Sequence, residues 1–482
     1  MRYRILQNKI VSSISTLISN KNIVFISTKY LSYLISFVVG IVIANRLGVF
    51  YFGVYGFIKM LMQYLSYSNF GVNYSGLILM SQQDRNDDNF NNKILLSSLT
   101  CSIIIFAILY LVFVSYYGYF IPLLDEKYFL SNYLYYIFFI VLFKQINVIY
   151  INLFRVYNRL GLINIAFLLP CLAELVVLPF ATGENLLHIV FLALAISNGI
   201  VMVIFAFSLP FKFRFIYEVK STVKLISRGI KLLIYNTSYY FIGLFTKSFV
   251  SKFFSVTIFS QFIFAYNISD AIMLLNNSIS FLLYPSVIKQ SMQLSGKALI
   301  KYLLEIQEKY MLLANIIIII AYMASPFLIV VTPQYSDSIP MLFILLFAQL
   351  LIANIFIMTT FLVQRKSENY LIVVGLTSLI ILLITNLAGY YSIGSVIVVP
   401  VVLSLVLVFY NVFIALKTIS KISKKYLFTL PRFLQYSLFL PNFIAVCSSF
   451  FMPYYISIAL YISSFLFFHH KKLSKIINSY IR

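Results

Sequence analysis

The sequence predicts an all-α polytopic membrane protein, and two observations carry this prediction. Apolar residues make up 62% of the 482 residues, and charged residues only 10%. A soluble protein cannot bury so much apolar surface, so lipid must be the solvent. The apolar residues also fall into successive stretches of about 20, the length at which a helix crosses the hydrocarbon core with all its backbone groups bonded internally.

These stretches predict about fourteen transmembrane helices. The predicted spans are 23–45, 50–70, 94–117, 132–154, 162–181, 186–208, 230–250, 257–284, 309–331, 338–363, 370–389, 393–416, 433–452 and 453–469. The last two belong to one apolar run that Pro441 and Pro453 interrupt. That run is either a tight hairpin around Met452-Pro453 or a single kinked helix.

Lys and Arg collect in every second gap between the spans, which places those gaps and both termini on the cytoplasmic side. The net charge of +23 would suggest nucleic acid in a soluble domain. Here the positive-inside rule accounts for it, and we expect no nucleic-acid partner. Residues 1–22 set basic side chains against Ile and Leu, so we expect an amphipathic N-terminus on the inner leaflet.

An internal repeat divides the chain into halves. When the sequence is aligned with itself at one fixed offset, two distant segments of the first half match the second half. Leu47 then aligns with Phe254, Phe154 with Phe361, and Arg159 with Lys366. Both halves start on the same side of the membrane, so the repeat is parallel, and such halves usually form a V around a central cavity.

The predicted organisation follows from the repeat. It comprises the N-terminus 1–22, a six-helix bundle 23–208, a basic cytoplasmic linker 209–229, a second six-helix bundle 230–416, a basic cytoplasmic loop 417–432, and a C-terminal helix pair with a basic tail 433–482.

Three segments resemble a known family. Ala44–Gly56 (ANRLGVFYFGVYG) is similar to the turn after the first helix of bacterial polysaccharide flippases, and Asn69-Phe-Gly-Val72 and the Arg155–Arg159 loop are also similar. The second half has Ser255 and Ser260 where the pattern has glycine. These flippases belong to the multidrug/oligosaccharidyl-lipid/polysaccharide exporter superfamily.

The resemblance implies alternating access in a bacterial inner membrane. It implies a substrate in which undecaprenyl pyrophosphate carries an oligosaccharide repeat unit of O-antigen or capsule. Membrane lipids, a polysaccharide polymerase and a chain-length regulator are the implied partners, and the protein is not expected to be an enzyme.

Ionisable groups inside spans normally face a cavity or a partner, because burying them in lipid costs a few kcal/mol. A diphosphate needs cations, and a glycan needs hydroxyl and amide groups. The candidates for a cationic cavity are Lys29, Lys59, Lys144, Lys247 and Arg46, and the polar candidates are Tyr55, Gln63, Asn236, Tyr266 and Asn277. Lysines near span ends, such as Lys252, can instead snorkel to the interface.

Two carboxylates, Glu174 and Asp270, also lie inside spans. Either can pair with a cavity lysine, or can titrate and couple transport to H⁺ or Na⁺. We expect no other cofactor and no metal, because three isolated cysteines and three histidines have no metal-ligand spacing.

Three rival functions remain. A lipid II flippase would differ only in the glycopeptide of its substrate. A cation-coupled drug antiporter of the same superfamily would need a cavity dominated by carboxylates. A membrane polysaccharide polymerase would carry a large external loop, whereas the longest external loop here is 118–131.

Overall fold

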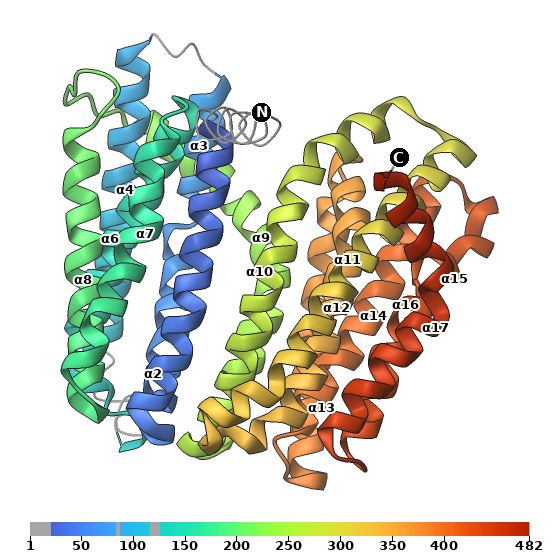
Figure 1. Ribbon diagram of the computed structural model, residues 1–482. Helices are drawn as coiled ribbons and strands as arrows, with labels where there is room; N and C mark the ends of the chain where they lie inside the picture. The colour runs from blue at the N-terminus through green and yellow to red at the C-terminus, as the bar shows by residue number, and fades with distance from the viewer. Residues whose placement is uncertain (1–20, 83–86, 116–125, 482) are drawn as a thin grey trace, which may run out of the picture. The chain divides into compact units, whose positions relative to one another are not determined.

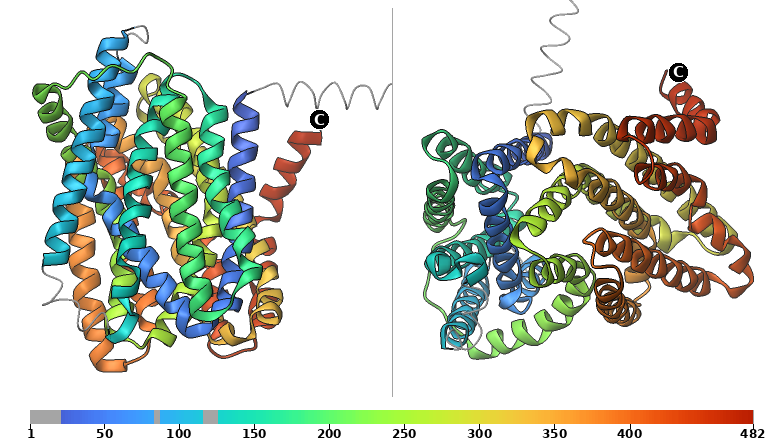
Figure 2. Two further views of the ribbon diagram at one scale, coloured as in Figure 1. Left: turned by 90° about the vertical axis from the view of Figure 1, so that its left-hand side faces the viewer. Right: turned by 90° about the horizontal axis from the view of Figure 1, so that it is seen from below.

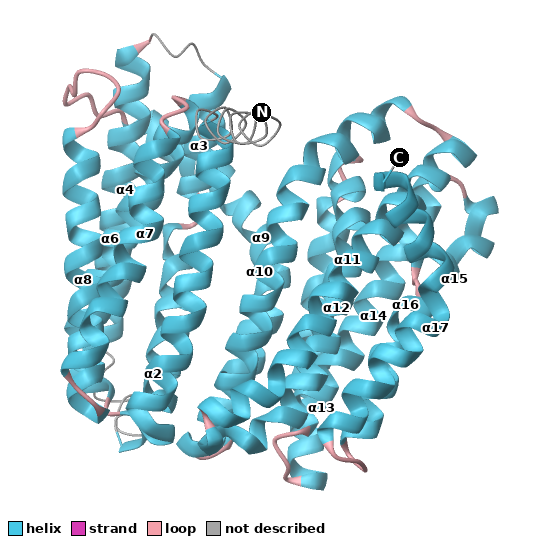
Figure 3. Cartoon of the chain, viewed as in Figure 1, coloured by secondary structure: helices cyan, strands magenta, loops and turns pink. Residues whose placement is uncertain are grey.

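The computed structural model describes residues 21–82, 87–115 and 126–481, and within these ranges every regular element is a helix (Figures 1 and 3). The predicted amphipathic segment 1–22 lies almost wholly outside them. Ten helical stretches of the described chain are long and apolar enough to cross a membrane. The chain is therefore a multi-pass membrane protein, and the predicted all-helical fold class is confirmed.

The ten stretches differ from the fourteen predicted spans for two reasons. The spans 23–45 and 50–70 lie in one stretch, and the helices that contain 230–250, 433–452 and 453–469 are not among the ten. The chain divides into two compact units, Met1–Asn236 (unit 1) and Thr237–Arg482 (unit 2). In each unit the long helices run side by side (Figure 2).

Unit 1 begins with a long broken helix, α2. Gly48 interrupts α2 with a φ of 72° and a ψ of 168°, a conformation that favours glycine. The two predicted spans 23–45 and 50–70 are therefore the two arms of α2. The unit consists of α2 (Lys21–Ser66), the 3-10 turn η1 (Tyr67–Asn69), α3 (Val72–Gln82), α4 (Asp88–Ser115), η2 (Leu130–Tyr133), α6 (Leu134–Val156), α7 (Leu160–Val177), η3 (Leu178–Phe180) and α8 (Gly183–Phe207).

Unit 2 begins within α9, which starts in unit 1 and continues across the boundary. The predicted linker 209–229, which contains Pro210, is thus helical only from Val219 onward, where no proline interrupts the sequence. The remaining elements are α9 (Val219–Phe253), α10 (Val256–Gln293), α11 (Gly296–Val331), η4 (Pro333–Ser338), α12 (Ile339–Gln364), α13 (Glu368–Ile393), α14 (Val398–Ile422), η5 (Lys424–Thr429), α15 (Leu430–Phe433), α16 (Tyr436–Ser449) and α17 (Tyr454–Ile481).

The repeat is visible in the helix breaks. Gly48 divides α2 and Ser255 caps α10 at the same displacement along the chain that the sequence predicted. The later match is one residue out of register. In the turn after α6, Asn158 has a φ of 56° and Arg159 N bonds to Phe154 O, whereas after α12 Lys366 has a φ of 52° and Ser367 N bonds to Leu362 O. The structure thus matches Asn158, and not Arg159, with Lys366, so the second half holds one extra residue before this turn.

The apolar run at the C-terminus forms two helices. α16 and α17 pack against each other, as a hairpin around Met452-Pro453 requires. Two hydrogen bonds fasten this pair to α11. Tyr322 Oη donates to Asn442 Oδ1 at 2.9 Å, and Tyr461 Oη donates to Asn315 Oδ1 at 2.9 Å. The pair is therefore an integral part of unit 2.

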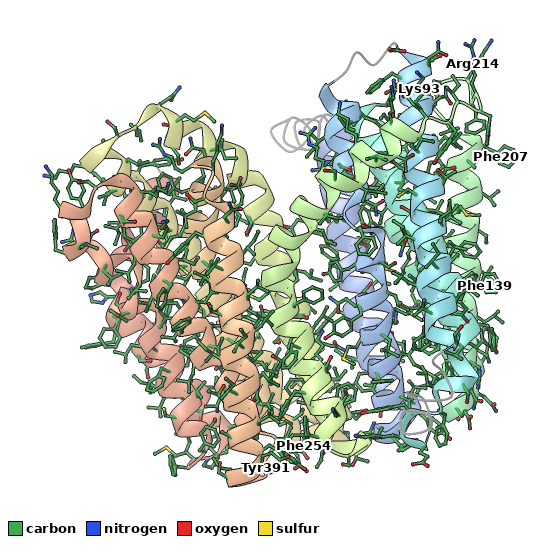
Figure 4. All side chains as sticks on the ribbon, turned by 180° about the vertical axis from the view of Figure 1, so that it is seen from behind. Lys93, Phe139, Phe207, Arg214, Phe254 and Tyr391 are labelled. Carbon is green, nitrogen blue, oxygen red and sulfur yellow. The ribbon has the colours of Figure 1, made fainter. Side chains whose placement is uncertain are left out.

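Each unit has its own apolar core. In unit 1, α6 and α8 meet through Phe154 and Phe205, whose ring centroids lie 5.0 Å apart. In unit 2, the turn η4 packs on α10 through Phe264 and Tyr335, at 4.3 Å. At one end of unit 2, Tyr390 of α13 contacts Phe254, which Figure 4 shows close to Tyr391. The aromatic residues that form 18% of the chain thus supply much of the packing.

Candidate functional site

Unit 1 contains an intramembrane ion pair between two predicted site residues. Lys59 lies on the second arm of α2 and Glu174 on α7, which packs against α2. Lys59 Nζ lies 2.9 Å from Glu174 Oε1, and the two side chains are 31% and 9% exposed. The carboxylate therefore balances the ammonium charge.

Tyr55 completes this pair. It precedes Lys59 by one helical turn, so its ring lies under the ammonium, with Lys59 Nζ 5.0 Å from the ring centroid. Its hydroxyl lies 3.5 Å from Glu174 Oε1. The ring also stacks on Phe191 of α8, with centroids 5.7 Å apart. The three residues thus form a packed cluster anchored to three helices.

A cavity of about 340 Å³ also lies inside unit 1, and Lys144 of α6 lines it. Lys144 makes no direct hydrogen bond or ion pair with any residue in the described part of the chain. Lys59 and Glu174, which are paired with each other, act on it with opposite signs. Lys144 therefore contributes one ammonium charge without a direct counter-ion.

Amide side chains contribute much of the polar lining of this cavity. They are Asn69, Asn73, Gln145, Asn147 and Asn198, and Ser32, Ser36, Ser66 and Cys171 join them. Several amide nitrogens donate to backbone carbonyls, as Asn147 does to Asn198 O at 2.9 Å and Gln145 to Leu65 O at 3.0 Å. These bonds hold the lining in a fixed arrangement.

The Asn69-Phe-Gly-Val72 segment shapes one wall. Asn69 Oδ1 accepts from Gly71 N at 2.9 Å, and Asn69 Nδ2 donates to Ser66 O at 2.8 Å. Both bonds satisfy backbone groups that the break between α2 and α3 leaves open. The Asn69 side chain thus stabilises the break between α2 and α3 and at the same time lines the cavity.

Unit 2 contains a second lysine–carboxylate pair. Lys247 of α9 lies 3.7 Å from Asp270 Oδ2 on α10, and its ammonium lies 4.0 Å from the ring centroid of Tyr266. Gln349 of α12 donates to Asp270 Oδ1 at 2.6 Å. The lysine side chain is 10% exposed and the aspartate side chain 45% exposed, so the carboxylate is the accessible member.

Gly243 makes room for this arrangement. It precedes Lys247 by one turn of α9, and a Cβ at this position would overlap the Tyr266 hydroxyl. A larger residue here would force the Tyr266 ring to shift from its place beside Lys247.

The other predicted residues lie outside these clusters. Lys29 is half-buried and its ammonium lies 5.7 Å from the rings of both Tyr33 and Phe167. Arg46 and Gln63 are exposed, and neither lines the cavity. The side chains of Asn236 and Asn277 are outside the described part of the structure.

Gln349 and the cavity amides are not among the site residues predicted from the sequence. Gln145 and Asn147 adjoin Lys144 in an apolar span, and Gln349 is the polar side chain of an apolar run. A polar amide in a membrane span needs a hydrogen-bond partner, just as an ionisable side chain needs a cavity or a counter-ion. Applied to amide side chains, this requirement would have identified these residues. Among the described residues no group of His, Cys, Asp and Glu could hold a metal ion.

Known structures share this fold. No protein-family model and no curated protein matches the sequence. The lipid II flippase MurJ, in an inward closed conformation, matches 94% of this chain and 100% of its own with a TM-score of 0.68 and 14% identity. An inward-facing MATE-family multidrug resistance transporter of the MOP superfamily matches 82% of this chain and 96% of its own, at a TM-score of 0.62 and 12% identity.

A third match is the MATE multidrug transporter DinF-BH, which covers 80% of this chain and 92% of its own with a TM-score of 0.56 and 15% identity. Identities this low define the fold only. The chain therefore has the fold of MOP-superfamily transporters.

Proposed function

We propose that this protein is a flippase that carries polyprenyl-pyrophosphate-linked oligosaccharides from the inner to the outer leaflet by alternating access. The observation that carries the proposal is Lys144, an ammonium without a direct counter-ion in the cavity of unit 1. A desolvated charge favours an anionic ligand, because the ligand supplies the missing partner. Amide and hydroxyl groups beside it suit the sugars of such a substrate.

The charge balance disfavours a drug antiporter for organic cations. Such a transporter needs carboxylates that carry uncompensated negative charge, but Lys59 offsets the charge of Glu174 and Lys247 offsets that of Asp270. The remaining charge in the unit 1 cavity is positive, which repels cations.

A lipid II flippase is the second candidate. The MurJ structure matches 94% of this chain, whereas the two MATE-family structures named above match 82% and 80%. The two candidate substrates share the polyprenyl pyrophosphate and differ in the group attached to it. An experiment that distinguishes the two candidates must therefore identify the group attached to the polyprenyl pyrophosphate.

We also propose that Asp270 is the coupling group if transport uses H⁺ or Na⁺. It is the more exposed of the two intramembrane carboxylates, so an ion can reach it without opening the helix packing. The proposed setting is a bacterial inner membrane with cytoplasmic termini, beside a polysaccharide polymerase and a chain-length regulator.

The test compares lipid-linked intermediates in cells with and without the gene. Deletion should cause undecaprenyl-pyrophosphate oligosaccharide to accumulate while surface glycan is lost, and the intact gene should reverse both effects. Rescue of cells depleted of their lipid II flippase would support the second candidate instead. Normal intermediates and normal glycan in the deletion strain would refute the proposal.

Lys144→Ala tests the observation directly. It should lower glycan export at least about tenfold, because the ligand loses its counter-charge, while Lys144→Arg retains part of the activity. Lys252→Ala, at an exposed lysine near the end of α9, is the matched control and should export normally.

The cavity also offers a binding readout. Cys171 lines it, whereas Cys101 is buried in the core and Cys447 lies on α16. In a Cys101→Ala/Cys447→Ala background, lipid-linked oligosaccharide should slow the reaction of Cys171 with a small thiol reagent. Unchanged labelling would place the substrate elsewhere.

A further inference from the structure

The segment that joins α8 to α9 exposes aromatic and basic side chains together. Phe207 is 89% exposed and Phe215 is 78% exposed. Further exposed apolar residues are Phe213, Tyr217, Val219 and Val223, and the exposed basic residues are Lys212, Arg214, Lys220 and Lys224. Figure 4 shows Arg214 and Lys93 at one end of unit 1, with Phe207 projecting from its side nearby. Residues 207–224 are called the joining segment below.

The joining segment is held against unit 1. Asn92 of α4 donates from Nδ2 to Lys212 O at 3.0 Å and accepts at Oδ1 from Arg214 N at 2.9 Å. The Arg214 side chain donates to Asn89 Oδ1 at 3.2 Å, and Phe211 is buried. These bonds fix which side chains point outward.

The first turns of α9 are held as well. Ser75 of α3 donates from Oγ to Leu225 O at 2.8 Å, and the backbones of Gly71 and Gly229 approach so closely that neither position could carry a Cβ. The face of α9 opposite this contact carries Val219, Val223, Lys220 and Lys224, all of them exposed.

Few carboxylates neutralise this surface. Glu218 is the acidic residue within the joining segment, and it is occupied by Lys93 at 3.9 Å and by the Ser221 hydroxyl at 2.8 Å. On the neighbouring turn, Asp87 Oδ1 accepts from Phe90 N at 3.0 Å and caps α4, and Asp88 beside it is exposed, so these three carboxylates are outnumbered by Lys93 and the four exposed basic residues of the joining segment. The outward surface is therefore positive.

We propose that the joining segment is a binding surface for anionic phospholipid headgroups of the bilayer. Water is a poor environment for exposed aromatic rings, and hydrocarbon is a poor environment for four basic side chains. The interface satisfies both, since aromatic rings settle at headgroup depth and lysine and arginine bind lipid phosphates. The proposal does not depend on the identity of the transported substrate.

The chain contains no tryptophan, so a single introduced tryptophan reports on one site. The test uses the full-length Phe215→Trp variant in bilayers of phosphatidylcholine and phosphatidylglycerol. Bromine atoms on the acyl chains quench tryptophan fluorescence. Two samples of the same lipid composition are compared: in one the phosphatidylglycerol is brominated, and in the other the phosphatidylcholine is brominated at the same mole fraction. Brominated phosphatidylglycerol should quench Trp at position 215 about twofold more than brominated phosphatidylcholine, because the basic residues enrich the anionic lipid.

Two variants serve as controls. Phe451→Trp, at an exposed position between α16 and α17, should be quenched equally by the two brominated lipids. Lys212→Glu/Lys220→Glu/Lys224→Glu in the Phe215→Trp background should remove the preference for phosphatidylglycerol but leave quenching by both lipids, which also shows that the segment is still in place.

Three results would overturn the proposal. They are the absence of quenching by either lipid, equal quenching by both lipids at position 215, and a preference that survives the three charge reversals.

Discussion

Single side chains decide which of the predicted lysines can bind a ligand. Lys59, Lys144 and Lys247 all lie in apolar helices, but Lys59 and Lys247 have a carboxylate partner and Lys144 has no direct one among the described residues. A paired lysine offers a ligand little net charge, whereas the lysine that lacks a counter-ion offers a full one. For this reason the proposed function assigns the anionic ligand to Lys144 and not to Lys59.

Glu174→Gln should destabilise unit 1, because it leaves the Lys59 ammonium without its counter-ion. Lys59 keeps partial exposure, so we expect a loss of about 2 kcal/mol, seen as a lower midpoint of thermal unfolding of the purified protein. Replacing both partners, as Lys59→Met/Glu174→Leu, should restore most of the stability. A double variant less stable than Glu174→Gln would contradict this account of the pair.

Lys59→Ala carries a related expectation. We expect a loss of export, and the change also leaves the Glu174 carboxylate without its partner lysine. Abundance should therefore fall as well, whereas Lys144→Ala should leave it unchanged. Immunoblots of membranes from both strains measure the difference.

At the scale of elements, the contact between α3 and α9 rests on two glycines. Gly71 has a φ of 75°, and a Cβ there would overlap the carbonyl of Gly229. Ser75 and Leu225 add a hydrogen bond one turn further on. Both helices can meet this closely only because neither carries a side chain at the crossing.

Gly71→Ala should cost about 3 kcal/mol, from the left-handed backbone and the backbone overlap together. Gly40→Ala is the matched control, since Gly40 lies within α2 with no atom near its missing Cβ. We expect that control to be neutral or slightly stabilising. Thermal unfolding in detergent measures both, and equal midpoints for the two variants would argue against the glycine contact.

A polar network fixes the short helix α15 to the main helices of unit 2. Gln307 of α11 donates to Asn354 Oδ1 at 2.7 Å and to Phe433 O at 2.8 Å. Asn354 of α12 donates to Asn411 Oδ1 of α14 at 2.9 Å. All three amide residues are buried, so each bond replaces one that water would otherwise supply.

Asn354→Leu should destabilise unit 2 by about 2–3 kcal/mol, because it removes the donor to the buried Asn411 Oδ1 and one acceptor of the Gln307 amide. Thr385→Val is a suitable control, since among the described residues the Thr385 hydroxyl bonds only to Ile381 O and Leu382 O of its own helix. If Asn354→Leu unfolded at the same temperature as the control, the network would have no stabilising role.

At the scale of the whole molecule, one helix plan is used twice with different chemistry. Gly48 and Ser255 mark equivalent breaks, and the turns after α6 and α12 share their hydrogen bonds. Both units place a lysine over a tyrosine ring beside a carboxylate, but unit 1 uses α2 and α7 while unit 2 uses α9 and α10. The two units therefore share their helix arrangement, but their lysine–carboxylate pairs lie on helices that do not correspond.

The charge distribution predicts the orientation of the entire chain. A reporter fused after Lys475 should read cytoplasmic, and one inserted after Ser395 in the turn between α13 and α14 should read external, because basic loops stay inside. Paired reporter fusions assayed in intact cells measure this. The opposite readout at both sites would show that the termini are external and that the basic loops do not lie on the cytoplasmic side.

The sequence by itself determined the all-helical class, the approximate position of most helices and the set of charged residues inside them. It could do so because lipid forces each apolar stretch into a helix and makes each intramembrane charge conspicuous. It placed Gly48 and Ser255 correctly but missed the one-residue shift before Lys366, since apolar sequences match one another in several registers.

Only the tertiary structure decided which charges meet. Glu174 lies far along the chain from Lys59, and Gln349 far from Asp270, so neither pairing can be read from helical spacing. Each pairing depends on how a helix is rotated toward its neighbours, and that rotation is set by packing across whole faces. The spacing of residues along the chain does not determine this rotation.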